Sequence, residues 1–491
     1  MKNYLRSLVM LSLTVLVCIV NIGAQTVTIE PIPNNTRYDD FAPSITNHGK
    51  LIIYSSDRDG KGQRLMSMEQ SNGMWSSSKL LNGDVNDAEH AGVGALTPDG
   101  QSMIFSATNH DVKGAGRTDL YIAQRRSGKW RDIGPLGSSV NSSSYDAQPS
   151  LSSDGRTLYF VSDRPGGQGA TDIYTSVWDG TEWSIATPVA GLNTASGEMS
   201  PVIAPDGRTL YFASDRSGGA GGYDIYVATV QNGSVSNVRR LREPINSPAD
   251  ELFYTALPNS DRAMMSRTTA SGDYDNFMVT PNPFPGDAVT LVEGIVRDEA
   301  SRDPLGAEIT VTDLKSGKRV ATLRSDDATG AYYVTLTAGR VYSITAVAED
   351  HVFHSERYEV PSGAKGRTVK KDIDLSRIRG GSGQLLVFFD TDKSELKSES
   401  MPELERVVAL LRENSSVRMR FDGHTDDQGT DDYNDGLSQR RADAVRTYVI
   451  SAGIEASRLT AKGYGKRRPM VRGNTDEDRQ QNRRVEMKIM E

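Results

Sequence analysis

Short runs of alternating apolar and polar residues recur through the N-terminal half of the chain, each broken by a tight turn. The fullest copies read PSLSSDGRTLYFVSDR from Pro149 and PVIAPDGRTLYFASDR from Pro201, and related segments begin at Pro43, Gly94 and Tyr254. Asp-Gly favours a two-residue hairpin turn, and the apolar run after it predicts a strand. A repeat length of roughly 50 residues is typical of a four-stranded unit. The pattern therefore predicts five four-stranded sheets.

The N-terminal strand is expected to complete the last of these sheets. Each repeat continues into a third strand and then a fourth, which carries Trp75, Trp130 or Trp183 in three of the copies. The fifth repeat lacks its fourth strand, but VTIEPIPNNTRYDDFAPSI from Val27 aligns with the fourth-strand stretch that begins at Trp183. Closing the ring in this way removes two exposed sheet edges. The expected fold is a five-bladed β-propeller, with six blades as the alternative.

These motifs give residues 25–281 a family resemblance. They resemble the PD40 repeats of TolB-type, WD40-like propellers, and the resemblance implies a protein-docking surface. Ser-Asp-Arg tripeptides begin at Ser56, Ser162 and Ser214. We interpret them as structural, because a group that recurs in every repeat more often braces a turn than performs chemistry.

Residues 282–379 predict a second β-rich module, since short alternating strands are separated by Gly, Pro and Asp turns. The module resembles the carboxypeptidase regulatory-like β-sandwich, which implies a spacer or adhesive role. The positions that carry this resemblance are Gly294, Pro304-Leu305-Gly306-Ala307, Gly330 and Tyr342. His351 and His354 are interpreted as solvated strand-end residues and not as metal ligands.

Two joints flank this module. The closely spaced prolines of residues 281–285 predict an extended, semi-rigid connection on its N-terminal side. Arg379-Gly380-Gly381-Ser382-Gly383 on its C-terminal side predicts a joint that bends easily.

Residues 380–491 mix helix and strand signals, which predicts a smaller α/β domain of βαβαβ order. LLVFFD at 385–390 reads as a buried strand, and apolar residues alternate through a second strand that ends near Phe421. Ser400-Met401-Pro402-Glu403 is typical of a capping box that starts an amphipathic helix. A second helix is expected in YNDGLSQRRADAVRTYVISAGI from Tyr433.

One pair of charged residues in this domain suggests a binding site. Arg441 lies four residues after Leu437 on the inward face of the second helix, where a guanidinium must find an anion. Asp426 follows the second strand and could face the same space. If the two residues pair with each other, the site is structural. If they are held apart, they suit a ligand with an ammonium and a carboxylate on one carbon, as in a free amino-acid terminus.

The surrounding sequence resembles the peptidoglycan-binding domain of the OmpA C-terminal family. The motifs are FDGHTDDQGTDDYNDGLSQRRADAVRTYVISAGI, RLTAKGYGKRRP and NTDEDRQQNRRVEMKI. The resemblance implies that Asp426 and Arg441 clasp the zwitterionic end of diaminopimelate in the stem peptide. Other motif positions are implied to shape the loop, bond to the ligand or flank the pocket: Thr425, Asp427, Asn434, Leu437, Arg483 and Arg484. The alternative for either of the last two arginines is that it only braces the last strand.

The first 24 residues predict a signal peptide, with Lys2 and Arg6 before a short apolar run and cleavage after Ala24. No other segment is apolar over a membrane-spanning length, so the mature chain is expected to be soluble. Cys18, the only cysteine, lies inside this leader. Its acylation is the less favoured alternative, because Leu16 and Val17 precede it where lipid-attachment sites favour small residues. The 491-residue chain has a formal net charge of −8, which disfavours nucleic-acid binding.

The sequence carries none of the HExxH, GxSxG or phosphate-cradling GxxxxGK[ST] motifs. We therefore expect a protein that is not an enzyme and needs neither cofactor nor metal.

The order of modules resembles accessory proteins of Bacteroidetes outer membranes, including a peptidoglycan-anchoring component of type IX secretion. The predicted function is that of a periplasmic scaffold, associated with the outer membrane, that tethers an outer-membrane β-barrel or secretion complex to peptidoglycan. The alternative is a surface adhesin that binds host protein or glycan.

Overall fold

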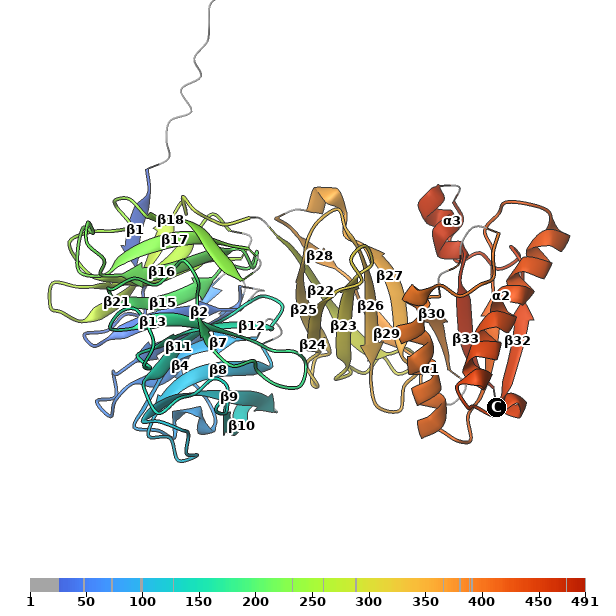
Figure 1. The fold of residues 1–491 in the computed structure, drawn as a ribbon, viewed down its shortest axis with the longest axis horizontal. Helices are drawn as coiled ribbons and strands as arrows, with labels where there is room; N and C mark the ends of the chain where they lie inside the picture. The colour runs from blue at the N-terminus through green and yellow to red at the C-terminus, as the bar shows by residue number, and fades with distance from the viewer. Residues whose placement is uncertain are drawn as a thin grey trace, which may run out of the picture.

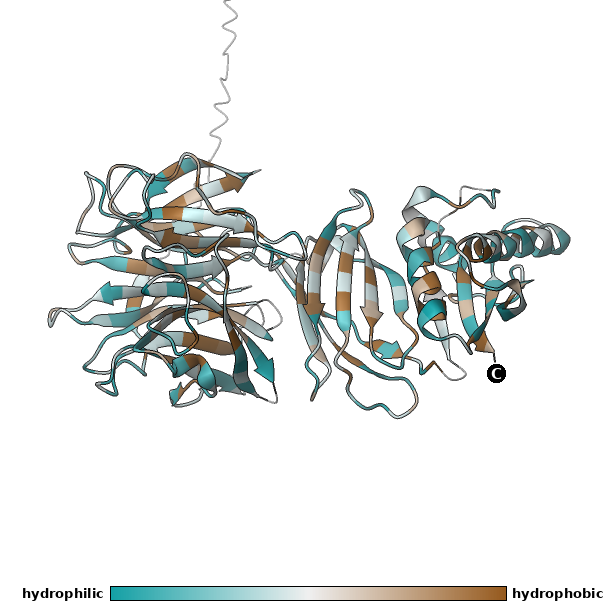
Figure 2. Ribbon diagram, turned by 60° about the horizontal axis from the view of Figure 1, so that its bottom comes forward, coloured by the Kyte–Doolittle hydropathy of each residue, from teal (hydrophilic) through white to brown (hydrophobic). Residues whose placement is uncertain are grey.

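The structure is a computed structural model, and the chain is mainly β with a few helices. It describes residues 26–490 except 47–48, 72–73, 98–99, 127, 232, 259, 288, 365, 379–380, 388, 390–391 and 474. The predicted signal peptide lies outside the described residues. The described residues form eight sheets, which follow one another in three parts along the long axis (Figure 1). Apolar and polar positions alternate along many strands (Figure 2).

The first part holds five antiparallel sheets. The first sheet contains β2 (Asp40–Ile45), β3 (Leu51–Ser56), β4 (Arg64–Ser71), β5 (Met74–Trp75) and β6 (Lys79–Leu80). The second contains β7 (His90–Leu96), β8 (Ser102–Thr108), β9 (Thr118–Arg126) and β10 (Lys129–Pro135). The third contains β11 (Asp146–Leu151), β12 (Thr157–Ser162), β13 (Asp172–Val177) and β14 (Thr187–Pro188). The fourth contains β15 (Glu198–Ile203), β16 (Thr209–Ser214), β17 (Asp224–Gln231) and β18 (Ser234–Arg240).

The fifth sheet joins the two ends of this part of the chain. It contains β19 (Glu251–Ala256), β20 (Ala263–Thr268), β21 (Tyr274–Thr280) and the N-terminal β1 (Thr28–Pro31). Strand β1 pairs antiparallel with β21, with Thr28 opposite Thr280, so the predicted completion of the last sheet is confirmed. The first strand of each sheet contacts the first strand of the next, and β19 contacts β2 again.

A β-bulge interrupts the first strand of each of these five sheets. The bulged residues have positive φ angles between 43° and 55°, and they are Ala42, Val93, Gln148, Ser200 and Phe253. A bulge turns a backbone N–H away from its own ladder. Here the Ala42 and Val93 amides donate to hydroxyls of the preceding sheets, Ser266 at 3.0 Å and Ser55 at 2.8 Å. The bulges therefore link neighbouring sheets as well as bending their strands.

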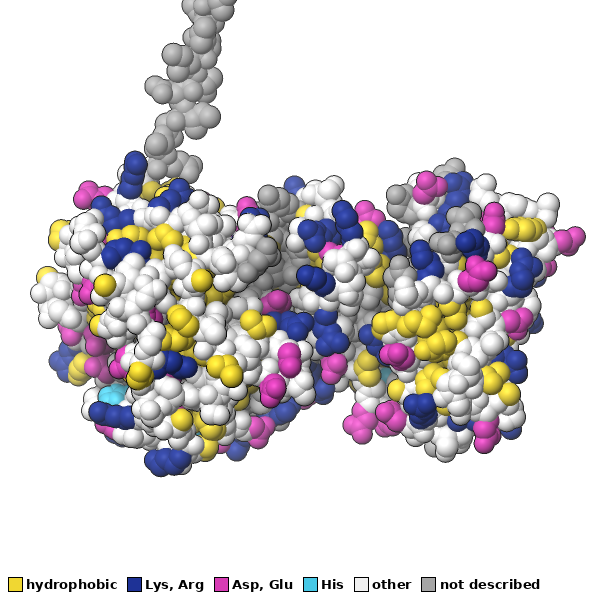
Figure 3. Space-filling model, in the orientation of Figure 1, with side chains coloured by type: hydrophobic (Ala, Val, Ile, Leu, Met, Phe, Trp, Pro, Cys, Tyr) yellow, Lys and Arg dark blue, Asp and Glu magenta, His cyan; other side chains and the backbone are white. Residues whose placement is uncertain are grey.

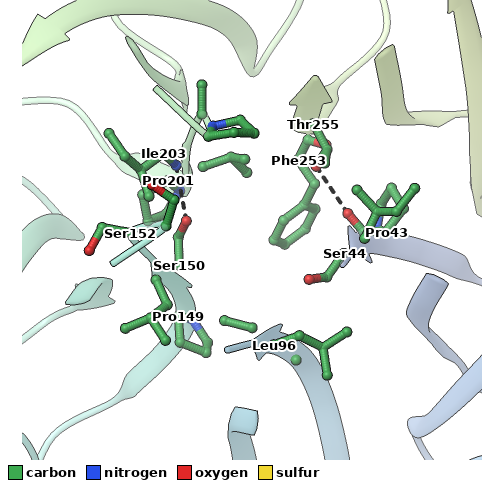
Figure 4. A pocket seen from close by; sticks show the side chains of 18 of the residues that line it. Pro43, Ser44, Leu96, Pro149, Ser150, Ser152, Pro201, Ile203, Phe253 and Thr255 are labelled. Carbon is green, nitrogen blue, oxygen red and sulfur yellow. Dashed lines mark hydrogen bonds between the residues drawn. The ribbon is translucent and has the colours of Figure 1, made fainter. Parts of the chain in front are cut away.

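The five first strands also surround a small cavity of about 90 Å³. Figure 4 shows it with two of the bonds that cross between sheets. The Ile203 amide donates to the Ser150 hydroxyl at 3.0 Å, and the Thr255 hydroxyl donates to the Pro43 carbonyl at 3.0 Å. Proline, serine and aliphatic side chains line the cavity, without a cluster of charged groups.

The arginines of the three Ser-Asp-Arg tripeptides are structural, as the sequence predicts, and Arg267 of the fifth sheet is placed in the same way. Each one pairs with a fully buried carboxylate at the start of its sheet. The pairs are Arg58 with Asp40 at 2.5 Å, Arg164 with Asp146 at 2.5 Å, Arg216 with Glu198 at 3.0 Å and Arg267 with Glu251 at 2.8 Å. The guanidinium of Arg164 also lies over the rings of Phe160 and Tyr174. These groups tie the end of the second strand to the start of the first.

The second part is a sandwich of two sheets whose inward residues form one apolar core. One sheet contains β22 (Thr290–Asp298), β25 (Ala331–Leu336), β28 (Thr368–Lys370) and β29 (Ile373–Leu375). The other runs in the order β24 (Arg319–Arg324), β23 (Glu308–Asp313), β26 (Val341–Val347) and β27 (His354–Glu359). The interpretation of His351 as solvated is wrong. Its ring is buried, and its Nε2 lies 3.1 Å from a carboxylate oxygen of Asp298.

The first joint packs against the fourth sheet. The hydroxyl of Tyr211 donates to the Phe284 carbonyl, and the guanidinium of Arg239 lies 4.8 Å from the centre of the Phe284 ring. The Asp287 amide donates to the Asp206 carboxylate at 2.7 Å. These contacts restrict the movement of the proline-rich connection.

The third part is an α/β domain. Its sheet runs in the order β30 (Ser382–Leu385), β33 (Val485–Met490), β31 (Arg418–Gly423) and β32 (Leu459–Gly463). Its helices are α1 (Met401–Glu413), α2 (Asp431–Ser451) and α3 (Asp476–Asn482). The first strand lies earlier than the sequence predicts, because β30 ends at Leu385 where the predicted strand begins.

The sandwich and this domain are packed together. Val352 and Phe353, next to β27, are buried in the apolar core of the α/β domain. The Ser355 hydroxyl donates to the Glu403 carboxylate at 3.0 Å. The predicted capping box is wrong, because the Ser400 side chain makes no cap hydrogen bond to α1 and the Glu403 carboxylate accepts from Ser355 of the sandwich. These contacts oppose the easy bending that the glycine-rich sequence predicts.

Replacing Arg164 by alanine tests the structural role of the repeated pairs. It leaves the Asp146 carboxylate, which is 0% exposed, without its cation. We expect the free energy of unfolding to fall by about 3–5 kcal/mol, as for other broken buried pairs. Arg126→Ala is the matched control, because both partners of the Arg126–Asp132 pair are more than half exposed and its loss should cost below about 1 kcal/mol. Equal losses in chemical denaturation would contradict a bracing role.

Candidate functional site

A cleft of about 480 Å³ opens in the α/β domain. It lies between the loop that follows β31, the first turns of α2 and the end of α3. The residues that line it are Asp392, Thr425, Asp426, Gln428, Gly429, Tyr433, Asn434, Leu437, Arg441, Asp476, Arg479 and Arg483. The cleft thus contains both members of the charged pair that the sequence singled out.

The loop between β31 and α2 is fixed by local hydrogen bonds. The Asn434 side-chain amide donates to the Gln428 carbonyl at 2.6 Å, and the Thr430 hydroxyl accepts from the Tyr433 amide at the start of α2. Gly429 has a φ of 85°, a conformation that favours glycine. These groups shape the wall that carries Asp426.

Asp426 forms its salt bridge with Arg483. The guanidinium Nη1 donates to a carboxylate oxygen at 2.6 Å, and the other carboxylate oxygen accepts from the Gln428 amide at 3.1 Å. Arg483 directly follows α3, whose N-terminus is closed by a capping box between Thr475 and Asp478. The aspartate is therefore oriented by two elements that are far apart in the sequence.

Arg441 lies on the inward face of α2 and is only 2% exposed. Its Nε donates to the Lys393 carbonyl at 3.1 Å, and its guanidinium lies 5.0 Å from the centre of the Phe389 ring. Burial lowers the pKa of Arg441, and the positive charge of Arg483 acts in the same direction, while the carboxylate of Asp426 raises it. A carboxylate that enters the cleft would offset this cost of burial.

Six of the eight residues named from the sequence line the cleft, and two do not. Asp427 pairs with Arg479 at 3.0 Å, which lowers the pKa of Asp427. Arg484 lies 2.6 Å from Glu486 on β33, so of the two arginines it is the one that braces the last strand. The Thr425 hydroxyl is buried in the cleft wall and makes no hydrogen bond within the described part of the chain.

Sequence reasoning missed several cleft residues. Arg479 precedes Arg483 by one helical turn of α3, and this spacing could have indicated a second arginine on the same face. Tyr433 and Asp392 gave no comparable signal, because their proximity depends on the path of the segment before α1. A hydrogen bond to Asp392 raises the pKa of the Tyr433 hydroxyl.

The comparisons with known proteins cover this domain. Residues 388–483 match the OmpA family. The peptidoglycan-associated lipoprotein of Pseudomonas aeruginosa is 42% identical over 131 residues, which are 27% of this chain and 74% of that protein. The chain belongs to the OmpA family. The resemblance inferred from the sequence is confirmed for this part of the protein.

Other relatives match a similarly short part of the chain. Outer membrane porin F of Pseudomonas aeruginosa is 42% identical over 107 residues, which are 22% of this chain and 31% of the porin. The chain thus spans less than a third of the porin's length. The crystal structure of the peptidoglycan-associated lipoprotein from Burkholderia pseudomallei is 29% identical and covers 21% of this chain and 88% of its own, with a TM-score of 0.21.

Two further features bear on the kind of site. Over the described residues, histidine, cysteine and carboxylate side chains do not gather in any group of three or more suited to a metal ion. The same residues contain no helix with the length and apolarity to cross a membrane.

A charge network in this OmpA-family domain joins Glu486, Arg484 and His424. Glu486 on β33 is 2.6 Å from Arg484 and 3.6 Å from His424. Burial alone would raise the pKa of Glu486, but the neighbouring His424 and Arg484 lower it to about 2, from an ordinary value of 4.5. A depressed carboxyl pKa stabilises the fold above the unfolded-state value, and the stabilisation is lost as the pH falls toward the folded-state value.

The free energy of unfolding of Glu486→Gln should therefore depend on pH differently from that of the wild type. We expect the difference between them to be largest above about pH 5 and to shrink as the pH falls from about 4.5 to about 2. Denaturation at several pH values measures it. Glu413→Gln, at the exposed end of α1, gives the background for the same substitution. A difference that does not change with pH would contradict the charge network.

Proposed function

We propose that the protein is a non-enzymatic envelope scaffold whose residues 380–491 bind peptidoglycan. The observation that carries the proposal is the cleft, which both Asp426 and Arg441 line. In it, a salt bridge to Arg483 holds the Asp426 carboxylate. The name of the Pseudomonas aeruginosa relative, peptidoglycan-associated lipoprotein, supports the same ligand for this domain. Its membership of the OmpA family supports a place in the periplasm next to the outer membrane.

The cleft suits the zwitterionic end of diaminopimelate in the stem peptide. Arg441 offers a planar, multi-donor group to the carboxylate, and Asp426 accepts hydrogen bonds from the ammonium. Arg483 holds Asp426 in place before the ligand arrives, so little orientational freedom remains to be lost on binding. The buried Thr425 hydroxyl is available for a further polar contact. The ligand undergoes no chemical reaction in this scheme, because Arg441 and Asp426 only bind its oppositely charged groups.

The N-terminal parts are proposed to hold a protein partner. We assign the boundaries as a signal peptide at 1–24, a PD40-type five-bladed propeller at 25–281, a regulatory-like sandwich at 282–379 and the OmpA-like domain at 380–491. The repeated sheets and their closed order of contacts support the propeller assignment. The proposed partner is an outer-membrane β-barrel or a secretion-complex protein, including one of type IX secretion.

A surface adhesin is the alternative, in which the first two parts bind host protein or glycan. Cell fractionation and surface proteolysis separate the two functions. A wall-binding scaffold keeps its C-terminal domain in the periplasm, protected from added protease, whereas an adhesin exposes the N-terminal parts on intact cells.

Retention on purified sacculi tests the binding site. We expect the mature full-length chain to sediment with sacculi, and Asp426→Ala and Arg441→Ala each to reduce retention by at least about tenfold, because each loses a charge-assisted bond to the ligand. The full chain is needed because Phe353 of the sandwich completes the core of the last domain.

Each matched control removes a charge of the same sign as the tested residue from a nearby exposed position on α2. Arg440→Ala and Asp432→Ala change exposed residues of α2 and should leave retention unchanged. Circular dichroism checks that each variant is folded. Folded Asp426→Ala and Arg441→Ala variants that sediment like the wild type would contradict the proposed site.

A further inference from the structure

A second groove, of about 320 Å³, lies between the sandwich and the OmpA-family domain. The sandwich contributes Arg357 and Tyr358 from β27, together with Lys371. The α/β domain contributes Gln480 and Arg483 at the end of α3. Neither part forms the groove alone. Lys and Arg side chains are frequent on the visible face of the sandwich (Figure 3).

The groove is preformed because the two parts are fixed to each other. Phe353 is buried in the core of the α/β domain, and Ser355 is hydrogen-bonded to Glu403. Glu403 also pairs with Arg406 at 2.8 Å, so its carboxylate has a cation as partner where the two parts meet. A ligand in the groove would not have to assemble its two walls.

Arg483 connects the groove with the cleft. Its side chain lines both, donating to Asp426 in the cleft and to Gln480 beside the groove. A ligand whose charged end occupies the cleft can therefore continue past Arg483 into the groove. Strands β27 and β30 are the edge strands of their sheets and contact each other where the two parts meet, and residues of β27 and residues at and after the end of β30 line the groove.

Four cations and two carboxylates line the groove, so its charges favour an anionic chain. Lys371 is tightly paired with Glu356 at 2.8 Å, and Arg484 with Glu486 at 2.6 Å. Arg357 makes a much longer contact, 3.9 Å to Glu359. Of these three cations, Arg357 therefore has the longest existing ion-pair contact, and it loses the least interaction energy when it binds a carboxylate of the ligand.

We propose that the groove binds the peptide that carries the diaminopimelate, and that Arg357 of the sandwich binds a carboxylate of that peptide. The inference rests on the proposed function and extends it, because it makes the sandwich part of the ligand site and not only a spacer. The side-chain end of diaminopimelate lies in the cleft, the chain passes Arg483, and the carboxylate of the residue that precedes diaminopimelate, which the free amino acid lacks, reaches β27.

Calorimetric titration of the mature chain with three ligands tests this assignment. The ligands are free meso-diaminopimelate, the stem tripeptide that ends in it, and the same tripeptide linked to its disaccharide. We expect the tripeptide to bind about tenfold more tightly than the free amino acid, as one additional charge-assisted bond implies. Arg357→Ala should lose this gain and bind free diaminopimelate as the wild type does.

Arg319→Ala is the matched control, because Arg319 is exposed on β24 at the opposite edge of the same sheet. It should bind all three ligands like the wild type. Equal affinities of the wild type for the tripeptide and the free amino acid would overturn the inference and leave the cleft intact. So would a gain that survives Arg357→Ala, or one that appears only with the disaccharide. A wild type that binds none of the three ligands would overturn the proposed function as well.

Discussion

The burial of the Arg441 guanidinium is the constraint on which the proposed binding site depends. A cation withdrawn from water requires compensating charge or hydrogen bonds. Here the Lys393 carbonyl and the Phe389 ring contact the guanidinium, while Asp426 is turned toward Arg483. The cleft is lined by three arginines and three aspartates, and Asp426 is the aspartate that Arg483 orients. In the proposed function a zwitterion contacts Arg441 and Asp426.

The parts outside the cleft serve to keep this arrangement in place. The capping box of α3 fixes the start of the helix that leads to Arg483, and the loop bonds of Asn434 fix the opposite wall. The packing of Phe353 joins the sandwich to the same domain. Because the first joint also packs against the fourth sheet, a force applied at the five sheets would pass to the cleft through packed contacts and not through a free linker.

Local patterns in the sequence were sufficient to predict most of the fold. The repeated Asp-Gly hairpins gave the five sheets, and the alignment from Val27 gave the strand that closes the last one. Periodicity placed Arg441 on the buried face of its helix. These features depend on residues close together in the chain or on repetition.

Features that depend on distant partners were not predictable in this way. Glu403 has the sequence position of a helix cap, yet it turns to Ser355 of another module. His351 looked solvated because nothing nearby reveals Asp298. Asp426 was expected either to pair with Arg441 or to stay apart, and its partner, Arg483, lies 57 residues away. Long-range ion pairs of this kind follow from the tertiary fold.

The central claim is that the cleft recognises an ammonium and a carboxylate on one carbon. The most direct measurement compares, by calorimetry, the affinity of the wild-type chain for two stem peptides that differ only in having diaminopimelate or lysine at the third position. Lysine lacks the second carboxylate, so the account predicts clearly weaker binding of the lysine peptide. Equal affinity for the two peptides would contradict it.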